Sequence, residues 1–146
     1  MALEIERKFL VSSDAWRVSA VSSVNIRQGY LSRAGEVSMR VRIAGTAAFL
    51  TLKTRDAGAV RQEFEYAIPP DEAERLLTLC EPPLIEKVRY RVPFGGRVWE
   101  VDEFKGSRAG LVLAECELQD AGDMLSIPEW VGAEVTSDPA YRNEAL

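Results

Sequence analysis

Residues 3–11 of the chain read Leu-Glu-Ile-Glu-Arg-Lys-Phe-Leu-Val, and the rest of the sequence is best interpreted from this stretch. With the two-residue period of a β-strand, Glu4, Glu6 and Lys8 fall on one face. The other face is mostly apolar, and Arg7 is its exception. An amphipathic edge strand with its charged face in water would show the same alternation, so this stretch alone does not define a function.

The composition of the 146-residue chain indicates one globular domain over residues 1–146. Hydrophobic residues make up 47%, and no apolar run approaches the roughly 20 residues that a membrane-spanning helix needs. The chain begins with a charged strand and not with a secretory signal, so we expect a cytoplasmic location and no membrane association. Cys80 and Cys116 lack zinc-site spacing, and we expect both to be packed thiols.

The charge balance excludes some partners and some kinds of chemistry. A net charge of −5 argues against a nucleic-acid-binding protein, because binding to the phosphate backbone needs a dominant basic surface. The chain contains no histidine, which is the usual general base near neutral pH and the commonest transition-metal ligand. A bound metal would therefore have oxygen ligands, which favours Mg²⁺ or Mn²⁺.

The alternation of charged and apolar residues recurs along the chain and predicts a sheet of antiparallel strands. After residues 3–11, the expected strands cover residues 25–31, 37–43, 49–54, 61–68, 85–92, 97–104 and 111–118. Short turns connect most of them, and a polar loop is expected over residues 56–59. We therefore predict a mainly β (α+β) fold in which eight antiparallel strands close into a barrel with flanking helices.

Several segments outside these strands are expected to be helical or irregular. The clearest helix covers residues 69–80, with prolines and acids in its first turn. A short capped helix over residues 15–18 is expected to bury Trp16 and Val18. Residues 123–130 are expected to be a short helical or irregular segment interrupted by Pro128, and a last helical turn is expected after Asp138.

Like charges stand two residues apart in the expected strands, and this separates them from ordinary solvated faces. Acids pair with acids and bases with bases, and such neighbours repel one another. The arrangement is tolerable if the acids share a divalent cation and the bases share an anion with several charges, as a polyphosphate with Mg²⁺ would provide. An eight-stranded barrel could point these side chains inward. The pairs are Glu4/Glu6, Arg40/Arg42, Glu63/Glu65, Lys87/Arg89, Glu100/Asp102 and Glu115/Glu117.

Taken in order, these blocks resemble the CYTH superfamily, the triphosphate tunnel metalloenzymes, and within it the short bacterial inorganic triphosphatases. The resemblance covers nearly the whole chain, although Ala140 stands where a basic residue often precedes the aromatic one. The matching blocks are Glu4-x-Glu6-x-Lys8, Arg40-x-Arg42, Thr51-Leu52-Lys53, Arg61-x-Glu63-x-Glu65, Lys87-x-Arg89-Tyr90, Glu100-x-Asp102-x-Phe104-x-Gly106, Glu115-x-Glu117, Val135-Thr136-x-Asp138 and Tyr141-x-Asn143.

The resemblance implies a tunnel that binds a triphosphate and hydrolyses it with a divalent metal, most simply inorganic triphosphate to diphosphate and phosphate. It implies that bases clamp phosphate oxygens and that acids hold the metal. The implied phosphate-binding residues are Lys8, Arg40, Arg42, Lys53, Lys87 and Arg89. The implied metal ligands are Glu4, Glu6, Glu115 and Glu117, with Glu63, Glu65 and Asp102 close behind.

The attacking water needs a group that orients or deprotonates it, and without histidine this is a lysine, a tyrosine or a carboxylate. Lys53, among other cations, is the candidate base, with Tyr30 as its hydrogen-bonding partner. In the short bacterial members a tyrosine and a lysine at similar places form such a pair. The alternative is that Tyr30 is an ordinary strand aromatic.

Other functions are compatible with the same sequence. The same tunnel would serve a class IV adenylate cyclase or a thiamine triphosphatase. A polyphosphate-binding module without turnover would need the bases but not the full set of acids. A β-rich interaction domain with solvated strand faces would need neither. The oligomeric state also stays open, with a homodimer as one option, because barrel exteriors and dimer faces are both apolar.

Overall fold

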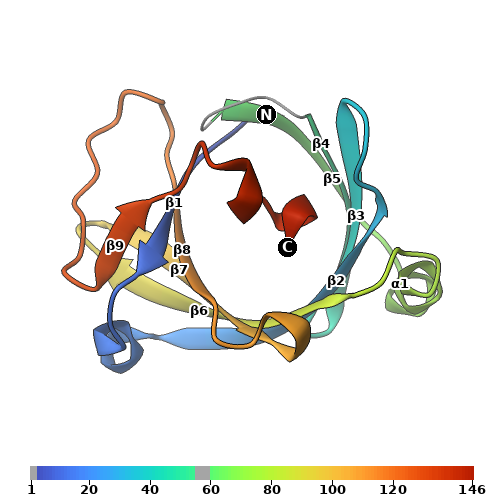
Figure 1. The fold of residues 1–146 in the computed structure, drawn as a ribbon, viewed down its shortest axis with the longest axis horizontal. Coiled ribbons are helices and arrows are strands. Elements are labelled where there is room, and N and C mark those ends of the chain that lie inside the picture. The colour runs from blue at the N-terminus through green and yellow to red at the C-terminus, as the bar shows by residue number, and fades with distance from the viewer. Residues whose placement is uncertain (1–2, 55–59) are drawn as a thin grey trace.

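The strands form a closed ring in the computed structural model, which describes residues 3–54 and 60–146. The ring runs β1, β5, β4, β3, β2, β6, β7 and β8, and β8 pairs again with β1. All pairings are antiparallel, so the predicted eight-stranded barrel is confirmed (Figure 1). The strands are β1 (Leu3–Val11), β2 (Ser22–Ser32), β3 (Val37–Ala44), β4 (Ala47–Thr54), β5 (Val60–Ala67), β6 (Ile85–Phe94), β7 (Arg97–Lys105) and β8 (Val112–Glu117).

A ninth strand, β9 (Val131–Glu134), lies outside the ring and pairs with the end of β1. The sequence did not predict it, because it has four residues and follows an irregular segment that contains Pro128. It explains the unexpected base on the apolar face of β1. Arg7 donates from Nε and Nη2 to the carboxylate of Glu134, at 2.9 and 2.7 Å, on the outside of the barrel.

One side of the barrel exterior is covered by an aromatic cluster. Trp16, Trp99 and Trp130 pack there with Phe9, and the Trp99 ring centroid is 5.4 Å from that of Phe9. Trp16 comes from a 3₁₀ turn (Ala15–Ser19), where the sequence predicted a short helix. The prediction that Val18 is buried is wrong, because the turn directs only Trp16 against the sheet and leaves Val18 93% exposed.

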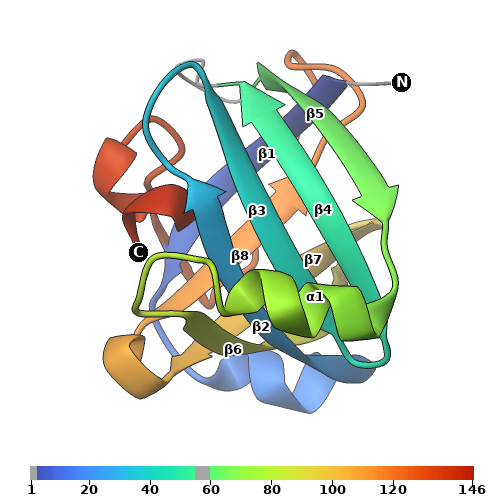
Figure 2. The ribbon, with the colours of Figure 1, turned by 90° about the vertical axis from the view of Figure 1, so that its right-hand side faces the viewer.

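The helix α1 (Pro70–Leu77) covers the opposite part of the exterior and lies across β2, β3 and β4 (Figure 2). Its Ala73 and Leu77 pack against Val41 of β3 in an apolar cluster. The segment after α1 approaches β2 so closely that only a glycine fits there. A Cβ atom on Gly29 would lie 2.7 Å from Leu84 Cδ2, well inside van der Waals contact.

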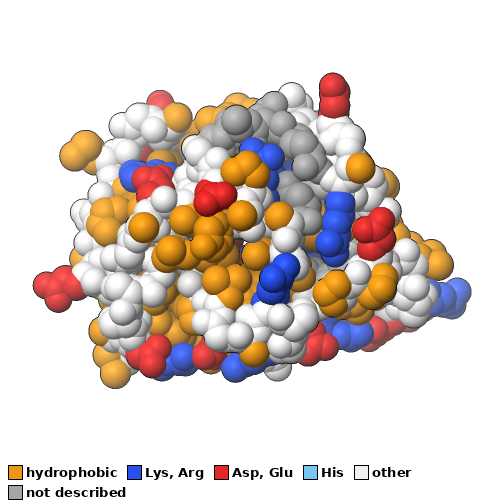
Figure 3. Space-filling view, viewed as in Figure 1, with side chains coloured by type: hydrophobic (Ala, Val, Ile, Leu, Met, Phe, Trp, Pro, Cys, Tyr) orange, Lys and Arg blue, Asp and Glu red, His pale blue; other side chains and the backbone are white. Residues whose placement is uncertain are grey.

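One end of the barrel is closed. Ile85, Phe104 and Leu113 point into this end and pack with Leu146, the last residue, and we call these four residues the apolar floor. Two 3₁₀ turns, Pro139–Tyr141 and Asn143–Ala145, lead to Leu146 and lie across the opening (Figure 1). In Figure 3 the middle of this end is mostly filled by hydrophobic and uncharged groups, with charged side chains around them.

The loop predicted over residues 56–59 lies outside the described residues. No helix in the described part of the chain is long and apolar enough to cross a membrane. Cys80 and Cys116 are both buried and unpaired, as expected.

Candidate active site

Inward-facing charges divide the barrel into two halves by sign. The consecutive strands β4, β3, β2 and β6 form a basic arc, and the consecutive strands β5, β1, β8 and β7 form an acidic arc. Lys8 and Arg61 are the exceptions, since they come from strands of the acidic arc. The basic arc carries Arg40, Arg42, Lys53, Lys87 and Arg89, and the acidic arc carries Glu4, Glu6, Glu63, Glu65, Glu100, Asp102, Glu115 and Glu117.

A cavity of about 200 Å³ lies between the two arcs. This size and its charged walls suit a small, highly charged ligand and not an apolar one. A second depression of about 320 Å³ near the other end of the barrel is lined by Leu3, Glu63, Glu65 and Glu117. The main cavity is lined by Glu4, Glu6, Arg40, Arg42, Lys53, Glu63, Glu65, Arg89, Glu100, Glu115, Glu117 and Asn143.

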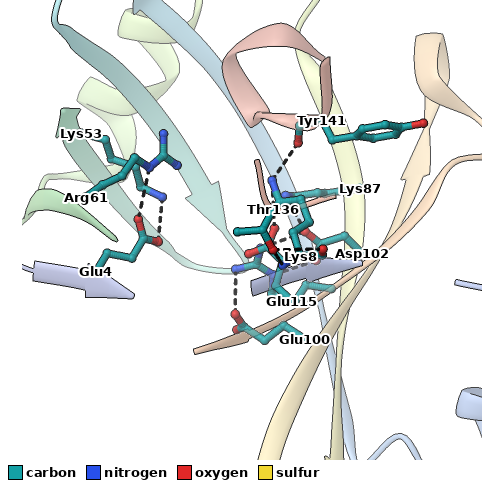
Figure 4. A network of polar contacts seen from close by, with 11 residues as sticks. Glu4, Lys8, Lys53, Arg61, Lys87, Glu100, Asp102, Glu115, Thr136 and Tyr141 are labelled. Carbon is teal, nitrogen blue, oxygen red and sulfur yellow. Dashed lines mark hydrogen bonds and ion pairs between the residues drawn. The ribbon is translucent and has the colours of Figure 1, made fainter. Parts of the chain in front are cut away.

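Asp102 is the centre of a buried network next to the apolar floor (Figure 4). It accepts from Lys87 Nζ at 2.6 Å and from Arg89 Nε at 2.8 Å. Burial would raise the pKa of Asp102, but Lys87 and Arg89 outweigh it and lower that pKa to about 2. Burial also lowers the pKa of Lys87 to about 7, although Asp102 opposes this shift. Asp102 is therefore bound to two cations and is not free to hold a metal in this arrangement.

Further ion pairs engage the acids, and the one between Lys53 and Glu4 joins the two arcs. Lys53 Nζ donates to Glu4 Oε1 at 2.9 Å, and Arg61 Nε lies 3.9 Å from Glu4 Oε2 (Figure 4). Burial opposes ionisation of Glu4, but Lys53 outweighs it and lowers the pKa of this carboxyl. Lys8 Nζ lies 3.7 Å from Glu115 and donates to the backbone carbonyl of Tyr141 at 2.8 Å. Lys8 thus connects the acidic arc to the C-terminal turns.

Three acids of the acidic arc are not sufficiently compensated by the cations that the structure describes. Burial, followed by repulsion from Glu115 and Glu4, raises the pKa of Glu6 well above its ordinary value. Burial raises the pKa of Glu63, against the opposing effect of Lys53, and it raises that of Glu117 with repulsion from Glu4. Such carboxyl groups gain most from a cation placed among them.

The acidic arc fits a divalent metal by the chemistry of its donors. All its candidate ligands are carboxylate oxygens, which Mg²⁺ and Mn²⁺ prefer. Glu4 Oε2 is buried and accepts no hydrogen bond among the described residues. Within the described part of the chain, however, no three acids converge as a formed metal site. Binding would therefore require these side chains to move, since Glu4 and Glu115 are engaged by Lys53 and Lys8.

Two arginines of the basic arc, Arg40 and Arg42, are held by neutral groups and retain unused donors. Arg42 Nε donates to Gln28 Oε1 at 2.7 Å, and Arg40 Nη2 donates to Thr51 Oγ1 at 3.4 Å. Arg40 Nε and Arg42 Nη2 are buried without a partner among the described residues. Burial, with repulsion from Arg40 and Arg89, lowers the pKa of Arg42 to about 9. An anion in the cavity would satisfy both donors.

Tyr30, the predicted partner of Lys53, is buried on an inward-facing position of β2. It lies directly opposite Arg40, and the guanidinium of Arg33 stacks 5.5 Å from the centre of its ring. Thr51 also pairs with Arg40, so Lys53 lies one inward-facing position further along β4. The described hydrogen bond of Lys53 goes to Glu4, and the Tyr30–Lys53 pair remains a prediction.

The predicted site residues all lie on inward-facing positions of the barrel strands, although they fall into two layers. Lys8, Lys87 and Asp102 lie beside the apolar floor, below the residues that line the cavity. Three residues near the charged groups had no predicted role. The two-residue period of the strand could have found Gln28, and Glu100 was known only as part of a block. Asn143 was likewise known only from the block Tyr141-x-Asn143, and the sequence could not place it in the cavity because it lies in a turn outside the sheet.

Comparisons with known proteins agree with this architecture. The chain matches the CYTH domain over residues 2–143. It is 48% identical over 147 residues to an inorganic triphosphatase of Acetivibrio thermocellus, covering 100% of this chain and 94% of the relative. It is 39% identical to an inorganic triphosphatase of Nitrosomonas europaea, covering 98% and 95%. A crystal structure of an inorganic triphosphatase superposes with a TM-score of 0.72 and 37% identity, covering 99% of this chain and 94% of that one. The chain therefore belongs to the CYTH family.

Proposed function

We propose that this protein hydrolyses inorganic triphosphate to diphosphate and phosphate inside the barrel. The observation that carries the proposal is the division of one cavity into a basic arc and an acidic arc. A polyphosphate and a divalent cation are the two ligands that would compensate both halves together. The full-length similarity to two inorganic triphosphatases supports the choice of substrate.

The basic arc would bind the phosphate chain. Arg40, Arg42 and Arg89 line the cavity, and their planar guanidinium groups match phosphate oxygens in pairs. Lys8 and Lys87 add positive charge from the layer beside the apolar floor. Phosphoryl transfer leaves the protein little covalent work, so catalysis depends on orientation and on stabilising charge that spreads over these oxygens.

The acidic arc would hold the divalent cation. Glu4, Glu6, Glu115 and Glu117 are the proposed ligands, with Glu63, Glu65 and Asp102 as further acids of the same arc. When bound, Mg²⁺ or Mn²⁺ would neutralise charge on the phosphate oxygens and help to orient the chain.

We assign the activation of water to Lys53, assisted by Tyr30. The water oxygen forms a bond to the terminal phosphorus, the bridging P–O bond breaks, and the water proton passes to the Lys53 amine. Only the neutral amine can accept this proton, so Lys53 must first release its ammonium proton to solvent and leave Glu4, which now accepts its hydrogen bond at 2.9 Å. Lys53→Ala is expected to lower kcat by about 10²–10⁴-fold and Tyr30→Phe by less. Unchanged pH–rate profiles in both variants would exclude this assignment.

Phosphate release from a panel of triphosphates tests the function directly. With Mg²⁺ we expect rapid release from tripolyphosphate, slow release from ATP and thiamine triphosphate, and none after addition of EDTA. Faster turnover of thiamine triphosphate, or formation of cyclic AMP from ATP, would instead indicate the thiamine triphosphatase or class IV adenylate cyclase alternative. Binding of tripolyphosphate without release would indicate a non-catalytic polyphosphate-binding module.

The remaining expectations concern the setting of the protein. We propose a cytoplasmic location, consistent with two buried free thiols, and no binding to nucleic acid or membrane. We also propose that residues 1–146 act as a single domain. Light scattering of the purified protein distinguishes a monomer from a homodimer.

A further inference from the structure

Asn143 is the uncharged member of the described cavity lining, in which every other side chain is an acid or a base. It lies in the 3₁₀ turn Asn143–Ala145, which crosses the closed end of the barrel. A neutral amide would add nothing to a lining whose role was only to balance charge. The amide is therefore better explained by hydrogen bonding to a ligand.

The side chain of Asn143 is buried with its hydrogen-bonding capacity incompletely used. The residue is 5% exposed, and its Oδ1 accepts no hydrogen bond from any described residue. A buried amide oxygen without a partner is costly, so native structures rarely keep one unless a ligand or water completes it. Arg40 Nε and Arg42 Nη2 are unsatisfied in the same way, and both residues line the same cavity.

The turn that carries Asn143 is fixed on both sides. Before it, the carbonyl of Tyr141 accepts from Lys8 Nζ at 2.8 Å. After it, Leu146 packs into the apolar floor, and its carbonyl accepts from Arg108 Nε at 2.9 Å. These contacts hold the amide at the closed end of the cavity without using its own polar atoms, as expected for a group reserved for a ligand.

We propose that Asn143 is a substrate-binding residue, whose amide hydrogen-bonds the phosphate group that reaches the closed end of the cavity. This inference rests on the proposed function. An amide can turn by 180° and present its NH₂ group to phosphate oxygens while its carbonyl accepts from water or an ammonium group. It would thus recognise the terminal phosphate group through directional hydrogen bonds, whereas the arginines and lysines act mainly through their charge.

Nuclear magnetic resonance of the side-chain amides tests the contact in the wild-type protein. The chain contains two asparagines, and the other, Asn25, is exposed on β2. Titration with tripolyphosphate in EDTA should shift the Nδ2 resonances of Asn143 and leave those of Asn25 unchanged. Saturation with tripolyphosphate without a shift at Asn143 would overturn the proposal.

Variants provide a second test. Asn143→Ala should raise KM for tripolyphosphate about tenfold with a much smaller change in kcat. Asn143→Asp keeps the shape but places a negative charge against the phosphate, and should raise KM about a hundredfold. Asn25→Ala and Asn25→Asp are the matched controls and should retain the wild-type KM. Thermal unfolding verifies that each variant is folded.

The outcomes separate this proposal from the proposed function. A wild-type protein that releases no phosphate from tripolyphosphate contradicts the function, while the resonance titration still reports whether Asn143 contacts the chain. A wild-type protein that is active, together with a wild-type KM in folded Asn143→Asp, contradicts the role of Asn143 alone. If tripolyphosphate binds too weakly without metal to saturate the protein, the KM values of the Asn143 and Asn25 variants decide whether Asn143 contacts the substrate.

Discussion

The acidic and basic arcs have opposite charges and also differ in how those charges are compensated. In the basic arc, Arg40 and Arg42 are supported by neutral oxygens of Thr51 and Gln28. In the acidic arc, Glu4 takes a cation from Lys53, whereas Glu6 keeps a raised pKa. Both arcs thus hold buried charge that the described residues do not fully compensate.

This difference indicates which ligand each arc needs. The unsatisfied donors of the basic arc need an anion, while the acids with raised pKa values need a cation. Uncompensated buried charge destabilises a folded protein, so its presence on both sides of one cavity is better explained by function than by stability. Substitutions in the acidic arc and substitutions in the basic arc should therefore differ in their effects on stability and on activity.

The largest effect on stability is expected from Asp102→Asn. Asp102 accepts from Lys87 and Arg89, and the change leaves two buried cations without their partner. Loss of one member of a buried ion pair lowers the free energy of unfolding by about 3 kcal/mol or more. Urea unfolding measures the change.

The matched control is Glu103→Gln, one residue along the same strand. Glu103 points outward and accepts from Arg17 at 2.6 Å, in a pair that solvent reaches. Exposed pairs contribute about 0–1 kcal/mol, so this variant should remain close to the wild type. Equal losses for Asp102→Asn and Glu103→Gln would contradict the special role of the inward network.

Removing an arginine of the basic arc should instead affect activity. Arg42→Met keeps much of the apolar stem but removes the guanidinium that we assign to phosphate binding. We expect kcat/KM for tripolyphosphate to fall about a hundredfold, the scale observed when one preorganised donor is lost. The outward Arg27, which pairs with Glu74 at 3.0 Å, is the control, and Arg27→Met should leave turnover unchanged. A similar fall in both variants would point to damage to the barrel.

The smallest effect, and the opposite sign, is expected for Glu6→Gln. Burial and two neighbouring acids raise the pKa of Glu6 in the folded state, so its ionisation opposes folding. Without ligand, the variant should be more stable than the wild type at neutral pH by about 1 kcal/mol. Its metal-dependent activity should nevertheless fall, because one proposed ligand is lost.

The pH dependence of this gain follows from linkage. With a raised pKa, the folded state binds more protons than the unfolded state, so the wild type loses stability as pH rises through that raised value. The advantage of Glu6→Gln should therefore shrink as pH falls and Glu6 becomes protonated. A gain that stays constant from neutral to acidic pH would exclude repulsion as its cause.

The sequence predicts the fold well wherever the two-residue period is strong. It predicts all eight strands of the ring, because charged and apolar residues alternate in at least seven of them. It fails where local pattern does not decide the outcome. Val18 is an apolar residue of the kind that is usually buried, but it lies on the solvent side of a short turn. The strand β9 forms only because β1 has a free edge with which it can pair.

The candidate site could be predicted as a set of residues but not as an arrangement. Periodicity and family resemblance identify which charges face inward, yet nothing in the sequence shows that β1 lies between β5 and β8. That pairing places Glu4 against Lys53 and groups the acids on one side. Asn143 was matched only as part of the block Tyr141-x-Asn143, and its place in the cavity could not be predicted because it depends on how the last residues fold back over the barrel.

The short seam between β1 and β5 has a consequence for how binding can be observed. In the described part of the chain, residues 3–5 pair there with residues 60–62, whereas β6 and β7 pair over residues 86–94 and 97–105. Backbone amides at the seam should exchange with deuterated water sooner than those between β6 and β7. Glu4 and Arg61 face each other at this seam, so a ligand held by the acidic arc should slow deuterium uptake there first.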